Sequence, residues 1–151
     1  MARFRYRMQS ILDIKNKMET QAKMEYGLAQ AHLNEELAKL AKLEQRRRSY
    51  ERKAKALREN ALKIRDILDT QTAIERMKEY ITEQKKSVQE AEKQVEAARL
   101  KLVEVMQERK THEKLKEKAF DTFMQEEKAS ESKEIDQLTS YTYGKKITED
   151  E

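Results

Sequence analysis

The sequence predicts an all-α protein in which two long helices form an antiparallel coiled-coil hairpin. First, 41% of the residues are charged and only 37% hydrophobic, which leaves little apolar material for a conventional globular core. Second, proline is absent, and the only glycines, Gly27 and Gly144, leave residues 28–143 without a helix breaker. Third, apolar residues recur in steps of three and four along most of the chain, which is the spacing of a coiled-coil seam.

The first helix is predicted over about residues 3–69. Its seam can be followed by steps of three and four through Phe4, Met8, Ile11, Lys15, Met18, Ala22, Tyr26, Ala29, Leu33, Leu37, Leu40, Leu43, Arg47, Tyr50, Ala54, Leu57, Ala61, Ile64 and Leu68. Only Lys15 and Arg47 in this series are neither apolar nor aromatic. Consecutive steps of four near Tyr26 and Leu37 predict a local unwinding of the supercoil.

The second helix is predicted over about residues 73–140, with a strict alternation of three and four. Its seam consists of Ile74, Met77, Ile81, Gln84, Val88, Ala91, Val95, Ala98, Leu102, Val105, Arg109, His112, Lys116, Ala119 and Phe123. The polar members Arg109, His112 and Lys116 lie close together, so we expect packing there that is either looser or shared with Leu115 and Phe120 on an adjacent stripe. Beyond Phe123 the apolar pattern decays, and residues 141–151 are predicted to form a frayed tail.

A turn is predicted at about residues 70–72, between the two seams. Asp69, Thr70, Gln71 and Thr72 form the poorest helix-forming tetrad in the middle of the chain, and Thr72 with Glu75 has the form of a capping box. Two arms of about equal length could then fold back on each other as a single coiled-coil domain over residues 1–151. A continuous rod that dimerises in parallel is the alternative.

The charge pattern argues against most other classes of protein. The 33 basic and 29 acidic residues are interleaved, as on a solvated helix surface, and we expect no nucleic-acid partner. The absence of cysteine excludes disulfides and thiolate metal sites, and no apolar run is long enough for direct membrane insertion. Residues 46–58 are the exception, with seven bases against Glu51. They form either a solvated face, partly neutralised across the hairpin by Glu90, Glu92 and Glu96, or a docking site for an acidic partner.

No residue pattern suggests catalysis, a cofactor or a metal. His32 and His112 lack a set of partner ligands, and a solvated histidine is the simpler interpretation for His32 beside Glu35 and Glu36. No phosphate-binding glycine loop or nucleophile motif is present. We therefore expect a protein that works by binding partners, and not an enzyme.

The first residues and the tyrosines are the candidate contact points. Arg3, Arg5 and Arg7 alternate with Phe4, Tyr6 and Met8, and no acid precedes Asp13. A mitochondrial presequence or a membrane-surface helix could share this composition, but the apolar spacing continues into the first helix, so we assign the segment to the mature fold. Among the tyrosines, Tyr26 and Tyr50 fall on the seam, whereas Tyr80 lies just beside it and could be an exposed anchor.

Both ends of the chain resemble the flagellar FliJ family. The opening FRYRMQSILDIKNKMETQAKMEYGLAQ is similar to the family's start, where aromatic and basic residues alternate before a run like LLDI. The distal segment RLKLVEVMQERKTHEKLKEKAFDTFMQEEKASESKEIDQL is similar to the family's basic RK, EKLKEK and closing acidic stretch. Order, spacing and total length agree over nearly the full chain.

The resemblance implies a component of the flagellar type III export apparatus, shaped like the central stalk of a rotary ATPase. It implies binding to the hexameric export ATPase, FliI, contact with the export gate, FlhA, and interaction with export chaperones. We expect a monomer when alone, cytoplasmic and peripheral at the inner face of the cell membrane at the flagellar base. The alternative is a structural coiled-coil dimer with no ATPase partner.

Two sets of site residues follow. The ATPase-binding surface is predicted to be Arg3, Phe4, Arg5, Tyr6, Arg7 and Met8, because this end combines apolar bulk with uncompensated positive charge. The resemblance places gate binding on Leu43, Tyr50 and Tyr80. Neighbouring Gln84, Ser87 and Ala91 depart from the apolar residues that the family more often has there.

Overall fold

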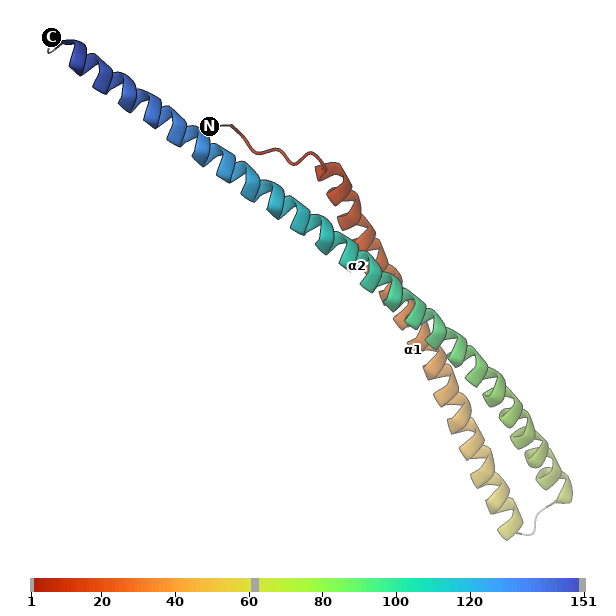
Figure 1. Cartoon of the computed structure of the whole chain (residues 1–151). Helices are drawn as coiled ribbons and strands as arrows, with labels where there is room; N and C mark the ends of the chain where they lie inside the picture. The colour runs from red at the N-terminus through yellow and green to blue at the C-terminus, as the bar shows by residue number, and fades with distance from the viewer. Residues whose placement is uncertain (1, 61–62, 150–151) are drawn as a thin grey trace. The chain divides into compact units, whose positions relative to one another are not determined.

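The computed structural model describes residues 2–60 and 63–149, which form two α-helices. Helix α1 spans Gln9–Glu59 (51 residues), and helix α2 spans Ile64–Glu149 (86 residues) (Figure 1). The described residues contain no strand, so the predicted all-α class is confirmed. Neither helix contains, within the described residues, an apolar stretch long enough to cross a membrane.

The chain divides into two compact units, and both helices contribute to each. Unit 1 consists of Met1–Glu19 and Val105–Glu151, and unit 2 consists of Thr20–Glu104. Unit 2 therefore holds the connection between the helices, whereas unit 1 pairs the beginning of the chain with the later part of α2.

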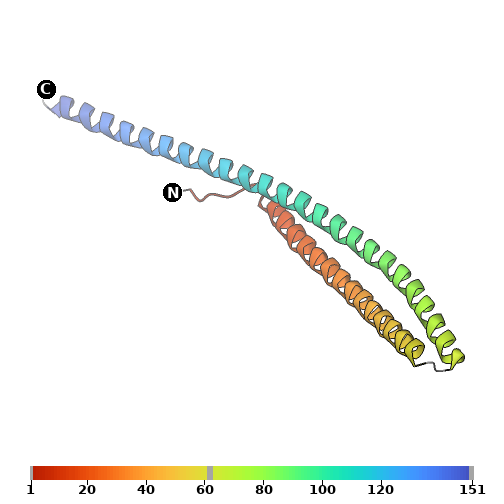
Figure 2. The same cartoon turned by 90° about the horizontal axis from the view of Figure 1, so that it is seen from below.

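Unit 2 is an antiparallel helical hairpin, in which α1 and α2 run side by side towards their connection (Figures 1 and 2). Three side-chain contacts between the helices set the direction. Glu25 pairs with Lys101 at 3.1 Å, Gln84 donates to the main-chain oxygen of Glu36 at 2.9 Å, and Arg58 reaches Gln71 at 3.5 Å. Residue numbers fall along α2 as they rise along α1, which confirms the predicted hairpin.

Unit 1 shows the same antiparallel direction. The Nζ of Lys15 lies 2.8 Å from a carboxylate oxygen of Glu108. The ring of Phe4 packs against those of Phe120 and Phe123, with centroids 5.2 and 5.4 Å apart. Phe4 precedes α1, so aromatic contacts hold the start of the chain on α2 before the first helix begins.

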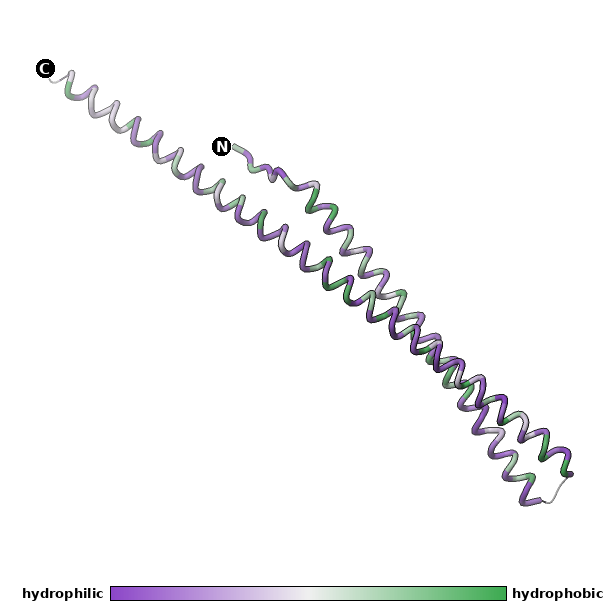
Figure 3. The backbone as a smooth tube through the Cα atoms, turned by 45° about the vertical axis from the view of Figure 1, so that its right-hand side comes forward, coloured by the Kyte–Doolittle hydropathy of each residue, from purple (hydrophilic) through white to green (hydrophobic). Residues whose placement is uncertain are grey.

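The buried stripe of α2 follows the predicted seam. All fifteen predicted positions from Ile74 to Phe123 are buried or half-buried. The stripe also continues backwards through Thr70 and Ile67 with the same spacing. Apolar and polar bands alternate along both helices (Figure 3), as expected for helices that bury one narrow stripe.

The seam of α1 differs from the prediction at three places. It begins at Leu12, which is buried, and not at the neighbouring Ile11. Met18 and Leu37 are exposed, and the neighbouring Glu19 and Glu36 are buried instead. With these two glutamates included, the seam from Leu12 to Leu57 alternates strictly in steps of four and three, so the local unwinding that we predicted is not needed. Each buried carboxylate has a partner on α2, because Glu19 pairs with Arg109 and Glu36 accepts from Gln84. A partnered charge can therefore occupy a core position.

The predicted turn at residues 70–72 is wrong, since this tetrad lies inside α2. The hydroxyls of Thr70 and Thr72 donate to the main-chain oxygens of Asp66 and Leu68, so these threonines are satisfied within a helix. Thr70 is also a core residue, only 6% exposed. The break lies earlier, after Glu59, where Asn60 follows α1 as a residue that suits a helix end.

The shifted break changes the seam and the lengths of the arms. Ile64 and Leu68, predicted to lie on the first seam, are exposed residues of α2, and Ala61 lies outside the described residues. The arms are unequal, and α2 continues as helix to Glu149 through the segment predicted to fray. Its last part, residues 128–149, is exposed throughout.

The beginning of the chain also differs, because α1 starts at Gln9 and not near residue 3. Arg3, Arg5 and Arg7 would place positive charge at the positive end of the helix dipole, which is unfavourable. In the non-helical segment before α1, Phe4 and Tyr6 are half-buried while the three arginines are exposed.

Candidate partner-binding surfaces

The grooves and acidic groups of the described residues bear on what the chain can bind. The described residues contain no group of three or more His, Cys, Asp or Glu side chains that could hold a metal ion. The described hollows are open grooves along the helices, lined largely by basic, polar and a few apolar side chains. Such surfaces suit protein partners better than a small substrate, which needs an enclosed and mostly apolar pocket.

The first candidate surface is the non-helical N-terminal segment of unit 1. Residues 3–8 line an open groove of about 630 Å³ together with Ala119, Thr122, Phe123 and Glu126 of α2. Phe4 anchors the segment edge-on to Phe120 and tilted against Phe123. All six residues predicted for ATPase binding are therefore gathered on one groove.

The charge of this surface comes from the arginines. Arg3, Arg5 and Arg7 are exposed and make no ion pair within the part of the chain that the structure describes. Because Phe4 and Tyr6 turn towards α2, the arginines are presented to the solvent side. The alternating sequence thus places Phe4 and Tyr6 against α2 and leaves the arginines on the outer face.

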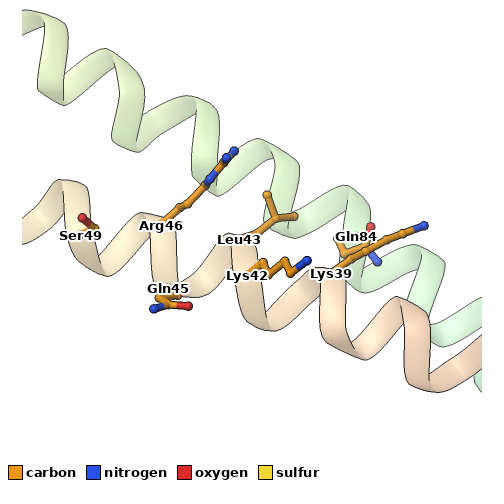
Figure 4. Close-up of a pocket in the computed structure, with 7 residues that line it drawn as sticks. All are labelled: Lys39, Lys42, Leu43, Gln45, Arg46, Ser49 and Gln84. Carbon is orange, nitrogen blue, oxygen red and sulfur yellow. The ribbon is translucent and has the colours of Figure 1, made fainter.

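The second candidate surface lies on one flank of the unit 2 hairpin. We call the side where Glu25 and Lys101 meet the Lys101 flank, and the side where Arg58 and Gln71 meet the Gln71 flank. An open groove of about 600 Å³ on the Lys101 flank is lined by Lys39, Lys42, Leu43, Gln45, Arg46, Ser49 and Gln84. Leu43 and Arg46 rise from α1 towards α2, and Gln84 comes from α2 (Figure 4).

The helix register places Tyr80 beside this groove. In an antiparallel coiled coil, one heptad forward on one helix corresponds to one heptad back on the other. Three heptads from the Glu25–Lys101 pair lead to Arg46 on α1 and Tyr80 on α2. Tyr80 is 49% exposed. The predicted residues Leu43 and Tyr80 therefore share one flank at one level of the hairpin.

The three residues predicted for gate binding differ in accessibility. Tyr80 is exposed, whereas Leu43 and Tyr50 are half-buried on the seam, two helical turns apart. Tyr50 does not line the groove that holds Leu43. Because α2 begins at Ile64, Tyr80 lies several turns into the helix and not at its start.

Sequence reasoning missed the basic lining of the groove and the role of Gln84. Lys39 and Arg46 each precede a seam residue of α1. Basic residues at these flanking positions can be assigned to one side of the hairpin only when the register between the helices is known. Gln84 donates to the carboxylate of Glu36 at 2.5 Å. This hydrogen bond, aided by the positive charge of Lys39, holds the pKa of Glu36 below its ordinary value of 4.5.

The basic stretch of residues 46–58 is less neutralised than the solvated-face interpretation required. Arg47 pairs with Glu51 at 3.0 Å on its own helix. Glu90, Glu92 and Glu96, which we expected to face the stretch, do not face it, because the register set by Glu25 and Lys101 places them level with residues 30–36 of α1. Glu96 pairs with Arg99 on its own helix at 2.6 Å. Among the described residues, Arg46, Arg48, Arg52, Lys53 and Lys55 make no ion pair, so positive charge remains on the outside of the hairpin.

Comparisons with known proteins agree in family and in fold. The family model described as flagellar FliJ protein matches residues 4–148. A solved chain described as a YscO homologue, CT670 from Chlamydia trachomatis, is similar in structure with a TM-score of 0.73. The two sequences are 24% identical, and the alignment covers 93% of this chain and 96% of the other. No curated protein sequence matches this chain.

Proposed function

Since this chain belongs to the flagellar FliJ family of coiled-coil proteins associated with type III export, we propose that it acts as a stalk between the export ATPase and the export gate. In this proposal it binds the hexameric ATPase, FliI, through unit 1 and the gate protein, FlhA, through the Lys101 flank of unit 2. It also meets export chaperones, and it works by contact without catalysing a reaction. Its place is the inner face of the cell membrane at the flagellar base.

The observation that carries the ATPase contact is the N-terminal segment held by aromatic packing. Phe4 fixes the segment to α2, so a partner meets the arginines without first having to order a free tail. Three exposed guanidinium groups favour an acidic lining on the partner, and Tyr6 and Met8 add apolar contact area.

Replacing Arg3, Arg5 and Arg7 together by Glu tests this contact. We expect stimulation of the purified export ATPase to fall to the rate of the ATPase alone, while helix content and melting temperature stay unchanged, because the arginines lie outside the packed stripe. The control variant changes Lys133, Lys145 and Lys146 to Glu, which alters the net charge equally on the exposed tail of α2. Stimulation that survives the arginine change would instead favour the loop-bearing end as the ATPase contact.

The proposed gate contact rests on Tyr80, Leu43 and the bases around them. An exposed ring beside a groove with a partly buried leucine and flanking cations has the features of an interface anchor. Truncation of such an anchor typically costs about 2 kcal/mol of binding free energy, whereas the stability effect of an exposed residue stays below about 0.5 kcal/mol.

Tyr80→Ala should therefore weaken binding to the cytoplasmic part of the gate at least tenfold and impair motility. ATPase stimulation and melting temperature should hardly change. Tyr141→Ala is the matched control, since Tyr141 is also an exposed tyrosine of α2. A large loss of stability with gate binding intact would identify Tyr80 as a packing residue.

The proposal also includes a monomeric state in solution. The helices bury their stripes against each other within one chain, so a second copy is not needed to cover them. Sedimentation equilibrium should give a mass near 18.0 kDa. A stable dimer would favour the structural coiled-coil alternative.

A further inference from the structure

A face at the loop end of unit 2 remains without an assigned role. On α1, Arg48, Lys55 and Arg58 follow one another at the spacing of a single helix face, and on α2 so do Ile64, Leu68 and Gln71. The contact from Arg58 to Gln71 joins the two rows on the Gln71 flank. We call these six residues the tip face.

The apolar part of the tip face is exposed beyond what a two-stranded coiled coil requires. Ile64 is 76% exposed and Leu68 is 60% exposed, although the stripe that meets α1 already contains Ile67 and Thr70. A two-stranded seam needs only that narrow stripe, whereas a helix that contacts two neighbours carries a wider one. The additional apolar row therefore fits a third helix lying in the groove beside α1 and α2.

The charged part of the tip face is almost entirely basic. Arg48 and Lys55 line one hollow with Arg52 and Glu51, and Glu51 is already paired with Arg47. Of the nearby acids of α2, Asp66 points to the opposite side of that helix from Ile64, and Asp69 lies about 140° around the helix from Ile64. Glu75 follows Leu68 by one heptad on the same face, further from the loop end. An incoming helix thus meets apolar side chains from α2 and uncompensated cations from α1.

We propose that the tip face binds an acidic amphipathic helix of a partner protein, at a site separate from the ATPase and gate surfaces. The leucine or isoleucine row of that helix packs on Ile64 and Leu68, and its glutamates or aspartates meet Arg48, Lys55 and Arg58. A membrane surface fits less well, because this short row has no aromatic residue and only two aliphatic ones.

The probe is a synthetic three-heptad helix with leucine at its core positions and glutamate at the flanking positions, measured by fluorescence anisotropy against the full chain. We expect saturable binding that weakens with added salt. A matched peptide with lysine in place of glutamate should not bind. Absence of saturable binding by the glutamate peptide, or equal binding of both peptides, would overturn the proposal.

Two double variants locate the site. Ile64→Ser with Leu68→Ser should weaken the glutamate peptide at least tenfold, and so should Arg48→Glu with Lys55→Glu. The matched control is Met24→Ser with Leu28→Ser, because these residues are equally spaced and comparably exposed on α1 within the same unit. Equal losses in the control, or none in the first two variants, would show that the peptide binds elsewhere. Circular dichroism verifies that every variant keeps its helix content.

Two further measurements separate this inference from its rivals. The Ile64 and Leu68 variant and the unchanged chain should bind equally to vesicles that contain an anionic phospholipid. If the unchanged chain binds the vesicles but not the glutamate peptide, and the variant loses the vesicle binding, the tip face is a membrane contact. The same variant should retain ATPase stimulation and gate binding. If gate binding falls as well, the tip face is part of the gate surface and not a separate site.

Discussion

The seams of the two units differ in chemistry. In unit 2 the fully buried positions are mainly aliphatic, as at Ile74, Ile81, Val88 and Ala91. In unit 1 the same stripe is interrupted by charge. Lys15 pairs with Glu108, and Arg109 lies between Glu19 and Glu113.

The charges of unit 1 are held by ion pairs between the helices and along α2. The bond to Glu113, together with the contact to Glu19, raises the pKa of Arg109 above its ordinary range, so the guanidinium stays charged. Among the described residues, the Nδ1 atom of His112, one turn further along the stripe, is buried without a hydrogen-bond partner. Packing here is more polar than in unit 2, because Arg109 and His112 occupy seam positions that are aliphatic in unit 2.

The apolar seam of unit 2 and the charged seam of unit 1 differ in what they contribute: the first mainly stability, the second mainly a fixed register between the helices. The connection between the helices lies in unit 2, so there the chain itself limits how far one helix can slip past the other. Unit 1 lies further from that connection along both helices, and there a uniform apolar stripe would resist a shift by one heptad less strongly. A buried charge pair excludes that shift because the shifted arrangement leaves both charges unpaired.

The largest effect is expected from a deletion in the apolar seam. Ile81→Ala removes a side chain that is only 4% exposed, and it should lower the free energy of unfolding by about 2–4 kcal/mol. Leu28→Ala, at an exposed site of the same unit, should change it by less than about 0.5 kcal/mol. Chemical denaturation of both variants measures the contrast. Similar values for the two would contradict the assignment of the seam.

A smaller loss of stability is expected from Arg109→Met, which leaves the Glu19 carboxylate without its partner on α2. The double variant Glu19→Leu with Arg109→Leu should recover the lost stability, because two apolar residues pack without desolvated charge. It should nevertheless broaden the distance distribution between spin labels at Lys17 and Lys110, both exposed in unit 1. An unchanged, narrow distribution would show that the charges do not set the register.

The smallest effect concerns acid stability and Glu36. Because its folded-state pKa lies below 4.5, this carboxylate contributes stability above about pH 4.5, and the contribution is lost as the pH falls through the lowered pKa. Glu36→Gln should therefore flatten the fall of the melting temperature on acidification below pH 4.5. Glu35→Gln, at the exposed neighbour, is the control and should keep the original slope.

The sequence predicted the class of fold, the antiparallel pairing and the seam of α2 from Ile74 to Phe123, because those features depend on a periodic apolar pattern. The position of the break was wrong, since the prediction weighed only local signals, the helix propensity of the tetrad and the capping-box pattern of Thr72 and Glu75. Thr70 and Thr72 are poor helix formers on average, but in α2 their hydroxyls are bonded within the helix and Thr70 is buried in the seam. Tertiary packing decided what local preference could not.

The candidate sites were predictable to different degrees. The alternation of Arg3, Phe4 and Arg5 is compatible with a non-helical segment and with the start of a helix. Only the contact of Phe4 with Phe120 and Phe123 shows how this segment packs. The groove beside Leu43 could not be assembled from the sequence. Its lining depends on which residue of α2 faces Leu43, and that register follows from contacts such as Glu25–Lys101.

The strict alternation of four and three has a consequence for how this family can change in length. Losing one residue from α1 within unit 2 would rotate all following side chains by about 100° and turn the stripe away from α2. Losing seven residues would preserve the stripe but shift its partners by a heptad, unless α2 also loses the facing seven. Insertions and deletions that evolution retains in the paired region of unit 2 should therefore come in matched heptads, with seven residues gained or lost on α1 and the facing seven on α2.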